Sequence, residues 1–380
     1  MKPTIVFFHP HFLLHGGATR VVLEQALGLQ TSGFDIQIIT TKSDPKIIAD
    51  FPHLKISTLS KYSTGNLMFW ITFPLFFYHL VKTINSIPNK ILYCHSLAIY
   101  WGILYKILHP NTKLIVYFHD LGFPYYDSLL ETSSLPFFPK IIINISKPIF
   151  NIFRSLLINL PDYTIANSLA CRNYISDNYH RLVDIVITPG VNTELFKPSS
   201  IKKKYLVTAG RLEKIKNIDT IIYAFASYIN QNKTSTISLI IAGDGIERLS
   251  LKNLSSKLGV STRIKFIGTQ PHSKLANLFS HALLGIYMSP AESFGLTAIE
   301  CLSSGTPIIG VNKNGIGQIT SEFDPNFLVS NSSIDLADKI TSILSKPIPE
   351  TLNKRARKAA LKYSWKIQVN ILTQWLKSSF

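Results

Sequence analysis

Acidic residues and cysteine are scarce in this chain. Among its 380 residues there are 22 Asp and Glu against 39 Lys and Arg, so the formal net charge is +17. An excess of positive charge of this size suits an anionic partner, such as a nucleic acid, an acidic membrane surface or a phosphorylated substrate. The cysteines are widely separated and have neither metal-type nor redox-type spacing, so we expect buried free thiols at Cys94, Cys171 and Cys301.

Two further signals are missing. No Asp-x-Asp triplet occurs, so we expect no essential Mg²⁺ or Mn²⁺ and assign no metal ligand. The opening MKPTIVFFHP leads into the polar HFLLHGGATR without a cleavage pattern, which favours a first β-strand over a secretory signal. We therefore expect a cytoplasmic protein.

Long uncharged runs are also few. The longest, residues 62–81, is just long enough to cross a bilayer, but its Pro, His, Asn and Gly residues favour a buried or interfacial helix. Residues 135–160 combine Phe and Ile clusters with basic residues, a composition typical of a segment on a membrane surface. An ordinary core helix with snorkelling bases fits that stretch equally well. We expect the protein to lie on the inner face of the membrane as a peripheral protein.

The chain does contain a regular alternation of short apolar runs and helical patterns, which indicates parallel α/β architecture. Two similar halves are joined by a polar, basic stretch at residues 192–204, which is typical of an interdomain linker. Residues 353–380 predict a single basic amphipathic helix. The expected strands lie at residues 4–9, 35–40, 90–96, 113–120, 162–168, 184–190, 204–210, 237–245, 264–269, 283–289 and 306–311.

Two of the few acids, Glu292 and Glu300, share one apolar stretch at residues 288–310. We expect a helix there from about Gly295 to Ser304, whose first amides would bind an anion. Its rise of about 1.5 Å per residue puts the two carboxylates roughly 10 Å apart. That separation suits a nucleotide diphosphate sugar, with Glu300 on the ribose and Glu292 on the hexose. The alternative is a carboxylate at the helix N-terminus beside one exposed glutamate.

Cations follow another of the expected strands. Arg211 and Lys216 come just after residues 204–210, where they suit a diphosphate, because a cation 4 Å from one phosphate charge gains about 4 kcal/mol at an effective dielectric of about 20. A solvated basic loop is the alternative. Gly243 and Gly245 end the next strand, either to let the backbone approach a ligand or as a plain strand-to-helix turn.

Together these stretches resemble the retaining glycosyltransferases of glycosyltransferase family 4. The resemblance rests on AESFGLTAIE with its Glu-x7-Glu spacing, SSGTPIIG, GRLEKIKNID, IAGDG, IKFIGT, DYTIANS, ITPGVNTELFKP and HPHFLLHGGATR, and so covers nearly the whole chain. The opening stretch is similar to mannosyltransferases that extend lipid-linked oligosaccharides. The resemblance implies a GT-B fold, in which two Rossmann-like α/β domains face a central cleft and a C-terminal helix crosses back to the N-domain. It implies an acceptor-binding domain at 1–195, a nucleotide-sugar-binding domain at 196–355 and the crossover helix at 356–380.

The resemblance also implies a catalytic set. Arg211 and Lys216 would neutralise the donor diphosphate, and Glu292 would contact the donor sugar. His119 matches the family's cleft histidine near the reacting sugar. Without the family, His119 is a strand-end histidine with satisfied hydrogen bonds, and His95 has a similar position with a weaker claim.

The implied donor-binding residues lie in both halves. Glu300 would hold the ribose, the double glycine near the N-terminus would close over the phosphates, and backbone amides at 294–296 would meet the diphosphate and sugar. The full set is Gly16, Gly17, Gly210, Arg211, Lys216, Gly243, Asp244, Glu292, Phe294, Gly295, Leu296 and Glu300.

Four positions depart from the family pattern. Gln318 stands where a glutamate is expected, and Asn314 replaces a glycine. Thr19 replaces a common acid, and Asn192 stands in GVN where many relatives have GVD. The changes at 314 and 318 concern how the donor is held more than activity.

The sequence therefore predicts a retaining, metal-independent transferase that moves a hexose, with mannose favoured, from a GDP- or UDP-linked sugar to a lipid-linked or saccharide acceptor. The nucleotide sugar is a substrate, and no cofactor is expected. Two alternatives are a non-catalytic, membrane-associated nucleotide-sugar-binding module and a GT-B nucleotide-sugar epimerase. A nucleic-acid binder fits the charge but shows no nucleic-acid-binding motif.

Overall fold

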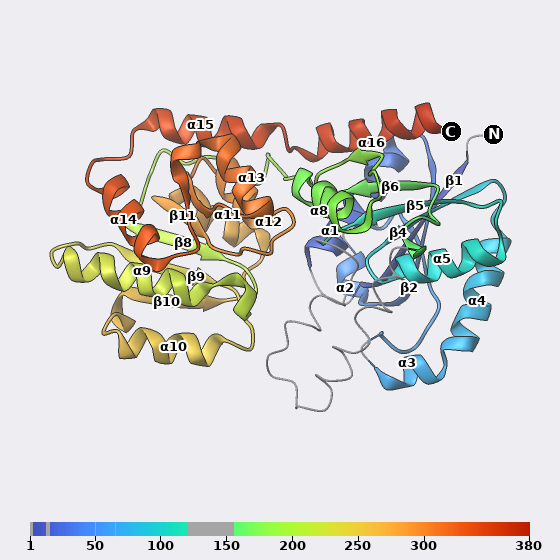
Figure 1. Cartoon of the computed structure of the whole chain (residues 1–380), viewed down its shortest axis with the longest axis horizontal. Coiled ribbons are helices and arrows are strands. Elements are labelled where there is room, and N and C mark those ends of the chain that lie inside the picture. Colours follow the sequence, from blue (N-terminus) through green and yellow to red (C-terminus); the bar gives the residue numbers. More distant parts are fainter. Residues whose placement is uncertain (1–2, 13–15, 50, 65, 121–155) are drawn as a thin grey trace. The chain divides into compact units, whose positions relative to one another are not determined.

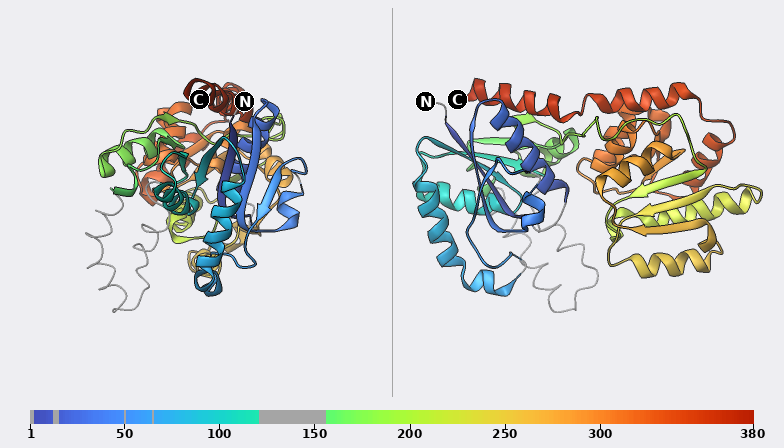
Figure 2. Two further views of the ribbon diagram at one scale, coloured as in Figure 1. Left: turned by 90° about the vertical axis from the view of Figure 1, so that its right-hand side faces the viewer. Right: turned by 180° about the vertical axis from the view of Figure 1, so that it is seen from behind.

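The computed structural model describes residues 3–12, 16–49, 51–64, 66–120 and 156–380 (Figure 1). The chain forms two compact units. Unit 1 comprises Met1–Thr188 and Gln368–Phe380, and unit 2 comprises Pro189–Ile367. Each unit is built on one parallel sheet with helices on both sides (Figure 2), which confirms the predicted pair of Rossmann-like α/β domains.

The sheet of unit 1 has seven strands in the order β3-β2-β1-β4-β5-β6-β7. The chain adds strands outward from β1 to β3 and then returns to the other side of β1 with β4. That reversal is a topological switch point, where open parallel sheets bind ligands. The strands are β1 (Thr4–Phe12), β2 (Asp35–Ser43), β3 (Lys55–Thr58), β4 (Lys90–His95), β5 (Lys113–Phe118), β6 (Tyr163–Ala166) and β7 (Ile185–Val186). The sequence did not predict the short edge strand β3, whose side chains are largely exposed.

The helices of unit 1 cover a sheet whose central strands are buried on both faces. Successive residues Ile5, Val6, Phe7 and Phe8 of β1 are all fully buried, which explains why this strand is a continuous apolar run. The described helices are α1 (Gly17–Thr31), α2 (Pro45–Ile48), α3 (Leu67–Ile71), α4 (Phe73–Asn85), α5 (Ala98–Leu108) and α8 (Leu169–Tyr179).

The sheet of unit 2 has six strands in the order β10-β9-β8-β11-β12-β13, with the switch point between β8 and β11. The strands are β8 (Tyr205–Ala209), β9 (Ser238–Ala242), β10 (Ile264–Gly268), β11 (Leu284–Tyr287), β12 (Ile308–Val311) and β13 (Leu328–Val329). The helices are α9 (Ile218–Gln231), α10 (Arg248–Lys257), α11 (His272–His281), α12 (Leu296–Ser303), α13 (Asn314–Phe323), α14 (Ser333–Leu344) and α15 (Glu350–Leu361), with short 3₁₀ turns η1 (Lys214–Lys216), η2 (Ser261–Arg263) and η3 (Pro325–Phe327).

The predicted single helix at 353–380 is wrong, because two helices, α15 and α16 (Trp365–Ser379), occupy this stretch. Between them the backbone pairs with Val191, whose N–H donates to the carbonyl of Tyr363 at 2.7 Å. The Tyr363 hydroxyl donates to Glu322. The backbone is therefore not helical between α15 and α16, where these hydrogen bonds form. From Gln368 onward α16 belongs to unit 1, as the fold predicted.

Close packing fixes the C-terminal helix within unit 1. Val369 of α16 lies against Gly28 of α1, where a Cβ would come within 2.5 Å of the valine side chain. Tyr163 packs edge-on against Trp375 and Phe380, with ring centroids 5.5 and 5.2 Å away. The three cysteines are buried free thiols, as the sequence predicted.

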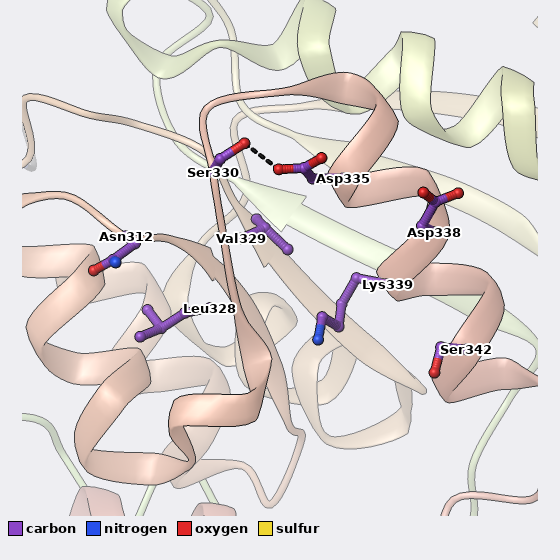
Figure 3. Close-up of a pocket in the computed structure, with 8 residues that line it drawn as sticks. All are labelled: Asn312, Leu328, Val329, Ser330, Asp335, Asp338, Lys339 and Ser342. Carbon is purple, nitrogen blue, oxygen red and sulfur yellow. Dashed lines mark hydrogen bonds between the residues drawn. The ribbon is translucent and has the colours of Figure 1, made fainter.

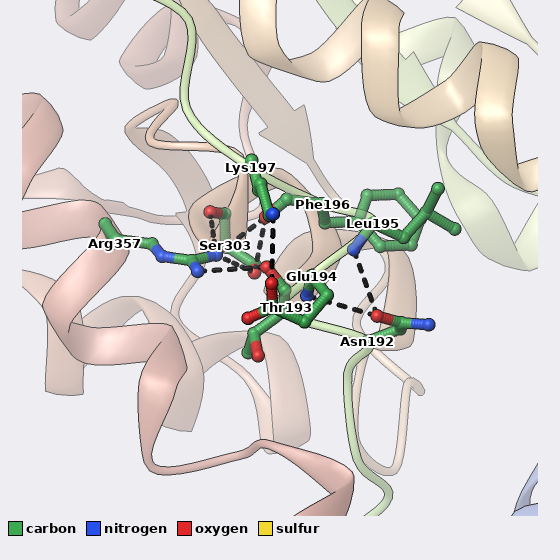
Figure 4. Close-up of polar contacts among 8 residues, drawn as sticks. All are labelled: Asn192, Thr193, Glu194, Leu195, Phe196, Lys197, Ser303 and Arg357. Atoms are coloured by element: carbon green, nitrogen blue, oxygen red, sulfur yellow. Dashed lines mark hydrogen bonds and ion pairs between the residues drawn. The ribbon is translucent and has the colours of Figure 1, made fainter.

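Arg357 of α15 binds the polar stretch that opens unit 2 (Figure 4). Its guanidinium donates to the carbonyls of Phe196, Ser303 and Thr193 at 2.7, 2.8 and 2.9 Å.

Asn192 shapes the same turn, since its side-chain oxygen accepts from the N–H groups of Glu194 and Leu195 at 3.1 and 3.0 Å (Figure 4). A carboxamide oxygen accepts here as a carboxylate would, which accounts for Asn192 in place of the family's aspartate.

We predict that Arg357→Ala lowers the free energy of unfolding of the chain by about 2–4 kcal/mol, because it leaves partly buried carbonyls without their charged donor. Urea denaturation would measure the loss. The matched control is Lys358→Ala, which removes an exposed cation from the same helix and should change stability by less than about 0.5 kcal/mol. Equal effects of the two substitutions would contradict this role.

Candidate functional site

The predicted donor residues of unit 2 gather at one edge of its sheet. Strands β9, β8 and β11 are neighbours and run parallel, so their carboxyl ends meet at the same edge. Gly243 and Asp244 follow β9, Gly210 and Arg211 follow β8, and Glu292 follows β11. This is the edge at which a parallel α/β sheet binds its ligands.

Lys216 and Glu292 form an ion pair across this edge, from the Nζ atom to Oε2. Their side chains are 21% and 26% exposed, so the pair is reachable from solvent. A second contact joins the same two loops, because the Ser289 hydroxyl donates to the carbonyl of Ile215 at 3.0 Å. An ammonium has three donors, so Lys216 can keep Glu292 and still bind an anion.

The loop after β11 is held in place from its far side by α13. The N–H of Gly315 donates to the carbonyl of Glu292 at 2.8 Å, and the Asn314 side chain donates to the carbonyl of Pro290 at 2.6 Å. Gly315 has no room for a Cβ, which would lie 2.5 Å from backbone atoms of Phe294. Asn314 has a φ of 45°, a conformation that asparagine tolerates better than most residues, so it replaces the expected glycine and adds a hydrogen bond.

The N-terminus of α12 completes this loop. Gly295 stands just before the helix with a φ of 107°, and a Cβ there would come within 2.6 Å of Ile316. The Phe294 side chain is buried and packs against Tyr363, with ring centroids 5.5 Å apart, so only its backbone could meet a ligand. Helix geometry leaves the first amides of α12, including that of Leu296, without intrahelical partners, as an anion site requires.

Glu300 lies one turn further along α12 and is only 3% exposed. This burial contradicts the alternative in which one of the two glutamates is exposed. The His272 Nδ1 atom, at the start of α11, lies 3.7 Å from the Glu300 carboxylate. A buried carboxylate needs such partners. Sequence reasoning missed His272, although its place directly after Pro271 at a helix start was a readable signal.

Arg211 and Asp244 make local contacts at the rim. Arg211 is 74% exposed and donates to Glu213 at 2.6 Å. Asp244 accepts from the N–H of Gly245 at 2.9 Å and from Arg248 at 2.5 Å, and the backbone hydrogen bond, followed by Arg248, lowers the pKa of its carboxyl. Both residues are thus placed near the site but are engaged with neighbours of their own.

The loops after β8 and β9 approach closely because both begin with glycine. A Cβ on Gly243 would lie 1.8 Å from the carbonyl oxygen of Gly210. Both residues have positive φ values, 140° and 156°. Gly210 and Gly243 therefore serve to let the two loops approach each other, because a side chain on Gly243 would block the contact.

Gln318 lies on α13 beside a second polar cluster. Its side-chain nitrogen donates to Glu322 at 3.0 Å, and Glu322 also accepts from Lys362 at 2.5 Å. Burial alone would raise the pKa of the Glu322 carboxyl, but Lys362, Tyr363 and Gln318 together hold it below its ordinary value. A glutamate at 318 would place a second negative charge beside Glu322, which gives a physical reason for the departure from the family pattern.

Unit 1 holds the remaining predicted residues. Gly16 caps α1 in an extended conformation and Gly17 is its first residue, just beyond β1. Thr19 is buried in the first turn of α1, where an acid would need a buried partner. His119 follows β5 and its Nε2 atom lies 3.0 Å from Nδ1 of His95 at the end of β4.

A third histidine, which sequence reasoning missed, lies on the adjacent strand β1. His9 is buried and makes a ring contact with Phe12. Burial, and secondarily the neighbouring histidines, hold the pKa values of His9 and His95 well below the ordinary range. Burial lowers the pKa of His119 to about 3. All three rings are therefore neutral at physiological pH.

Comparisons with known proteins show the family to which the chain is related. Residues 191–363 match the family described as glycosyl transferases group 1, and residues 15–195 match Glycosyltransferase Family 4. The chain belongs to these glycosyltransferases. It is 26% identical over 231 residues to the D-inositol 3-phosphate glycosyltransferase of Corynebacterium aurimucosum, a match that covers 55% of each chain. The chain thus spans about half the length of the curated relatives it matches.

Two solved structures share the fold of this glycosyltransferase family member. Sucrose-phosphate synthase from Thermosynechococcus elongatus is 19% identical with a TM-score of 0.79, over 100% of this chain and 99% of its own. Anabaena Alr3699/HepE, in complex with UDP and glucose, is 18% identical with a TM-score of 0.77, over 100% of both chains. Together with the two parallel sheets, these likenesses establish the GT-B fold.

A separate pocket of about 540 Å³ lies where β12 and β13 end beside α14 (Figure 3). Ser330 donates a hydrogen bond to Asp335 across its rim. None of the predicted donor residues lines it. Its lining is Asn312, Leu328, Val329, Ser330, Asp335, Asp338, Lys339 and Ser342.

The predicted membrane segments have different outcomes. Residues 67–71 and 73–85 form α3 and α4, and several large apolar side chains on them are exposed. Most of the second segment, residues 135–160, lies outside the described residues. In the part of the chain that the structure describes, no helix combines the length and hydrophobicity needed to cross a bilayer. Nor do the described residues include three or more His, Cys, Asp or Glu placed to hold a metal ion.

We predict that this glycosyltransferase loses stability as the pH falls below about 6.5. The unfolded chain then protonates histidines that the folded chain keeps neutral, so each of His9, His95 and His119 lowers the free energy of unfolding by up to about 1.4 kcal/mol per pH unit. Urea denaturation between pH 7.5 and 5.5 measures this slope. His119→Gln should flatten it and the exposed His53→Gln should not, whereas identical slopes in all three proteins would refute the prediction.

Proposed function

We propose that this chain is a retaining glycosyltransferase that moves a hexose, with mannose favoured, from a GDP- or UDP-linked sugar to a lipid-linked or saccharide acceptor. Family membership supports the reaction class. The observation that carries the assignment of the donor site is the solvent-reachable pair Lys216–Glu292, at the sheet edge that also carries the N-terminus of α12. We propose unit 2 as the donor-binding domain and unit 1 as the acceptor-binding domain.

In this proposal the donor diphosphate binds between cations and helix amides. Lys216, Arg211 and the amides of Phe294, Gly295 and Leu296 stabilise the charge that grows on the diphosphate as the glycosidic bond breaks. These groups belong to loops that are already held in place by hydrogen bonds, so little reorganisation is needed in the transition state. Metal independence is part of the proposal, and unchanged turnover in EDTA is its test.

Carboxylates fix the two sugar rings. Glu292 accepts hydrogen bonds from hydroxyls of the hexose, and Glu300, supported by His272, accepts them from the ribose. Glu292 is paired with Lys216 and serves as a hydrogen-bond acceptor, not as a covalent nucleophile. Retention then follows from attack on the face that the diphosphate leaves, with a departing phosphate oxygen accepting the acceptor's proton.

The test of Glu292 separates catalysis from binding. Glu292→Gln should lower kcat for hexose transfer by about 100-fold or more, because the neutral amide holds the sugar hydroxyls and Lys216 less strongly. The fold should survive, since a partly exposed ion pair contributes at most about 1 kcal/mol. Glu350→Gln, which removes an exposed surface pair with Lys354, is the matched control and should leave kcat unchanged.

Two outcomes of that assay point to other functions. Nucleotide-sugar binding without transfer to any acceptor would indicate a non-catalytic binding module. Consumption of the donor with no acceptor present would indicate an epimerase.

A panel of GDP, UDP and ADP and their sugars identifies the base, since a nucleotide at 100 times its Kd stabilises the fold by about 2.7 kcal/mol.

We also propose that the protein works on the inner face of the membrane and binds it through α3 and α4. Six large apolar side chains are exposed within twelve residues of chain there: Leu67, Met68, Trp70, Ile71, Leu75 and Tyr78. Aromatic and aliphatic residues of this kind enter the interface between headgroups and acyl chains. The net charge of +17 favours anionic lipid.

Vesicle flotation tests this surface. The double substitution Ile71→Glu and Leu75→Glu should weaken binding to vesicles with anionic phospholipid at least tenfold, because each buried aliphatic side chain contributes about 1.5–3 kcal/mol. Ile246→Glu with Leu249→Glu, two exposed aliphatics of unit 2, is the matched control and should bind as the unmodified chain does. Unmodified protein that fails to float at low salt would end the membrane proposal.

A further inference from the structure

Three histidines stand side by side at the carboxyl edge of the unit 1 sheet. They come from neighbouring strands: His9 from β1, His95 from the end of β4, and His119 from just beyond β5. His95 is completely buried and stacks between the rings of Phe7 and Tyr117, with centroids 5.5 and 5.2 Å away. Its Nδ1 atom lies 3.0 Å from Nε2 of His119, so one of these two nitrogens must donate a proton to the other.

The other ring nitrogen of His95 decides the direction of this hydrogen bond. His95 Nε2 is buried and has no hydrogen-bond partner among the described residues. A neutral imidazole carries one N–H and one lone pair. A buried N–H without an acceptor is rarer than a buried acceptor without a donor. The proton of His95 therefore sits on Nδ1, where it has an acceptor, and the lone pair sits on Nε2.

This hydrogen bond determines which ring nitrogen of His119 carries the proton. Because His95 donates from Nδ1, His119 accepts at Nε2 and must carry its own proton on Nδ1. Burial keeps both rings neutral, so neither nitrogen of the contact gains a second proton near pH 7. The backbone of His119 is fixed as well, since its carbonyl accepts from the Asn167 side chain at 2.5 Å.

We infer that His95 is a positioning residue that locks His119 in the Nδ1–H tautomer and makes it a neutral hydrogen-bond donor. This state suits a sugar hydroxyl oxygen, which accepts from an N–H without a change of protonation. The consequence for catalysis rests on the proposed function and on the family resemblance, which implies that His119 contacts the reacting sugar. The tautomer itself follows from unit 1 alone.

Nitrogen-15 NMR of the full chain with labelled histidine tests the tautomer directly. The His119 signals, assigned by their loss in His119→Asn, should show a protonated Nδ1 and an unprotonated Nε2 at pH 7.5. His95→Leu removes the donor and should shift His119 toward the Nε2–H form. His95→Asn, whose amide N–H can take the place of Nδ1–H, should restore the original pattern. An Nε2–H tautomer in the unmodified chain would overturn the inference.

Kinetics of the same variants test the consequence. His95→Leu should lower kcat for hexose transfer about 10- to 100-fold with little change in KM for the nucleotide sugar, and His95→Asn should recover most of the loss. Equal losses in both variants, or a loss that follows thermal stability alone, would contradict a positioning role. If the unmodified chain transfers no hexose, the proposed function fails, while the NMR result still decides the tautomer.

Discussion

The ion pair between Lys216 and Glu292 is the interaction on which the candidate site depends. It joins loops that are 76 residues apart in sequence and that leave the neighbouring strands β8 and β11 at the same edge of the sheet. An unpaired ammonium or carboxylate would be well solvated at this edge and free to adopt many rotamers. Pairing them fixes both charges and leaves each with hydrogen-bonding capacity for a ligand, so the site is partly organised before any ligand binds.

Hydrogen bonds and glycine conformations also fix the backbone around this pair. Gly315 and Asn314 hold the loop of Glu292 from behind, and Gly295 turns the chain into α12 with a positive φ. Gly210 and Gly243 permit the contact between the other two loops. In unit 1 the paired rings of His95 and His119 serve the same purpose with neutral groups. In both units, side chains at strand ends are oriented by contacts among themselves.

The sequence predicted what local patterns encode. Apolar runs located most strands, the Gly-punctuated stretch after β11 located α12, and the motifs together predicted the GT-B fold. It could not predict which side chains meet, because the partners come from other strands or helices. His272 of α11 is the partner of Glu300 in α12, and His95 at the end of β4 is the partner of His119 beyond β5. It also missed the interruption between helices α15 and α16 at Lys362–Ser364. The hydrogen bond from the Val191 N–H to the Tyr363 carbonyl is a tertiary contact that overrides the helical periodicity there. The roles assigned to the site residues remain predictions.

A crystal structure of the chain with a bound nucleoside diphosphate tests the central claim most directly. The account predicts that the diphosphate lies within hydrogen-bonding distance of Lys216 Nζ and the first amides of α12, with the ribose against Glu300. A diphosphate bound elsewhere, such as the pocket lined by Ser330 and Asp335, with the Lys216–Glu292 pair facing only solvent, would contradict it.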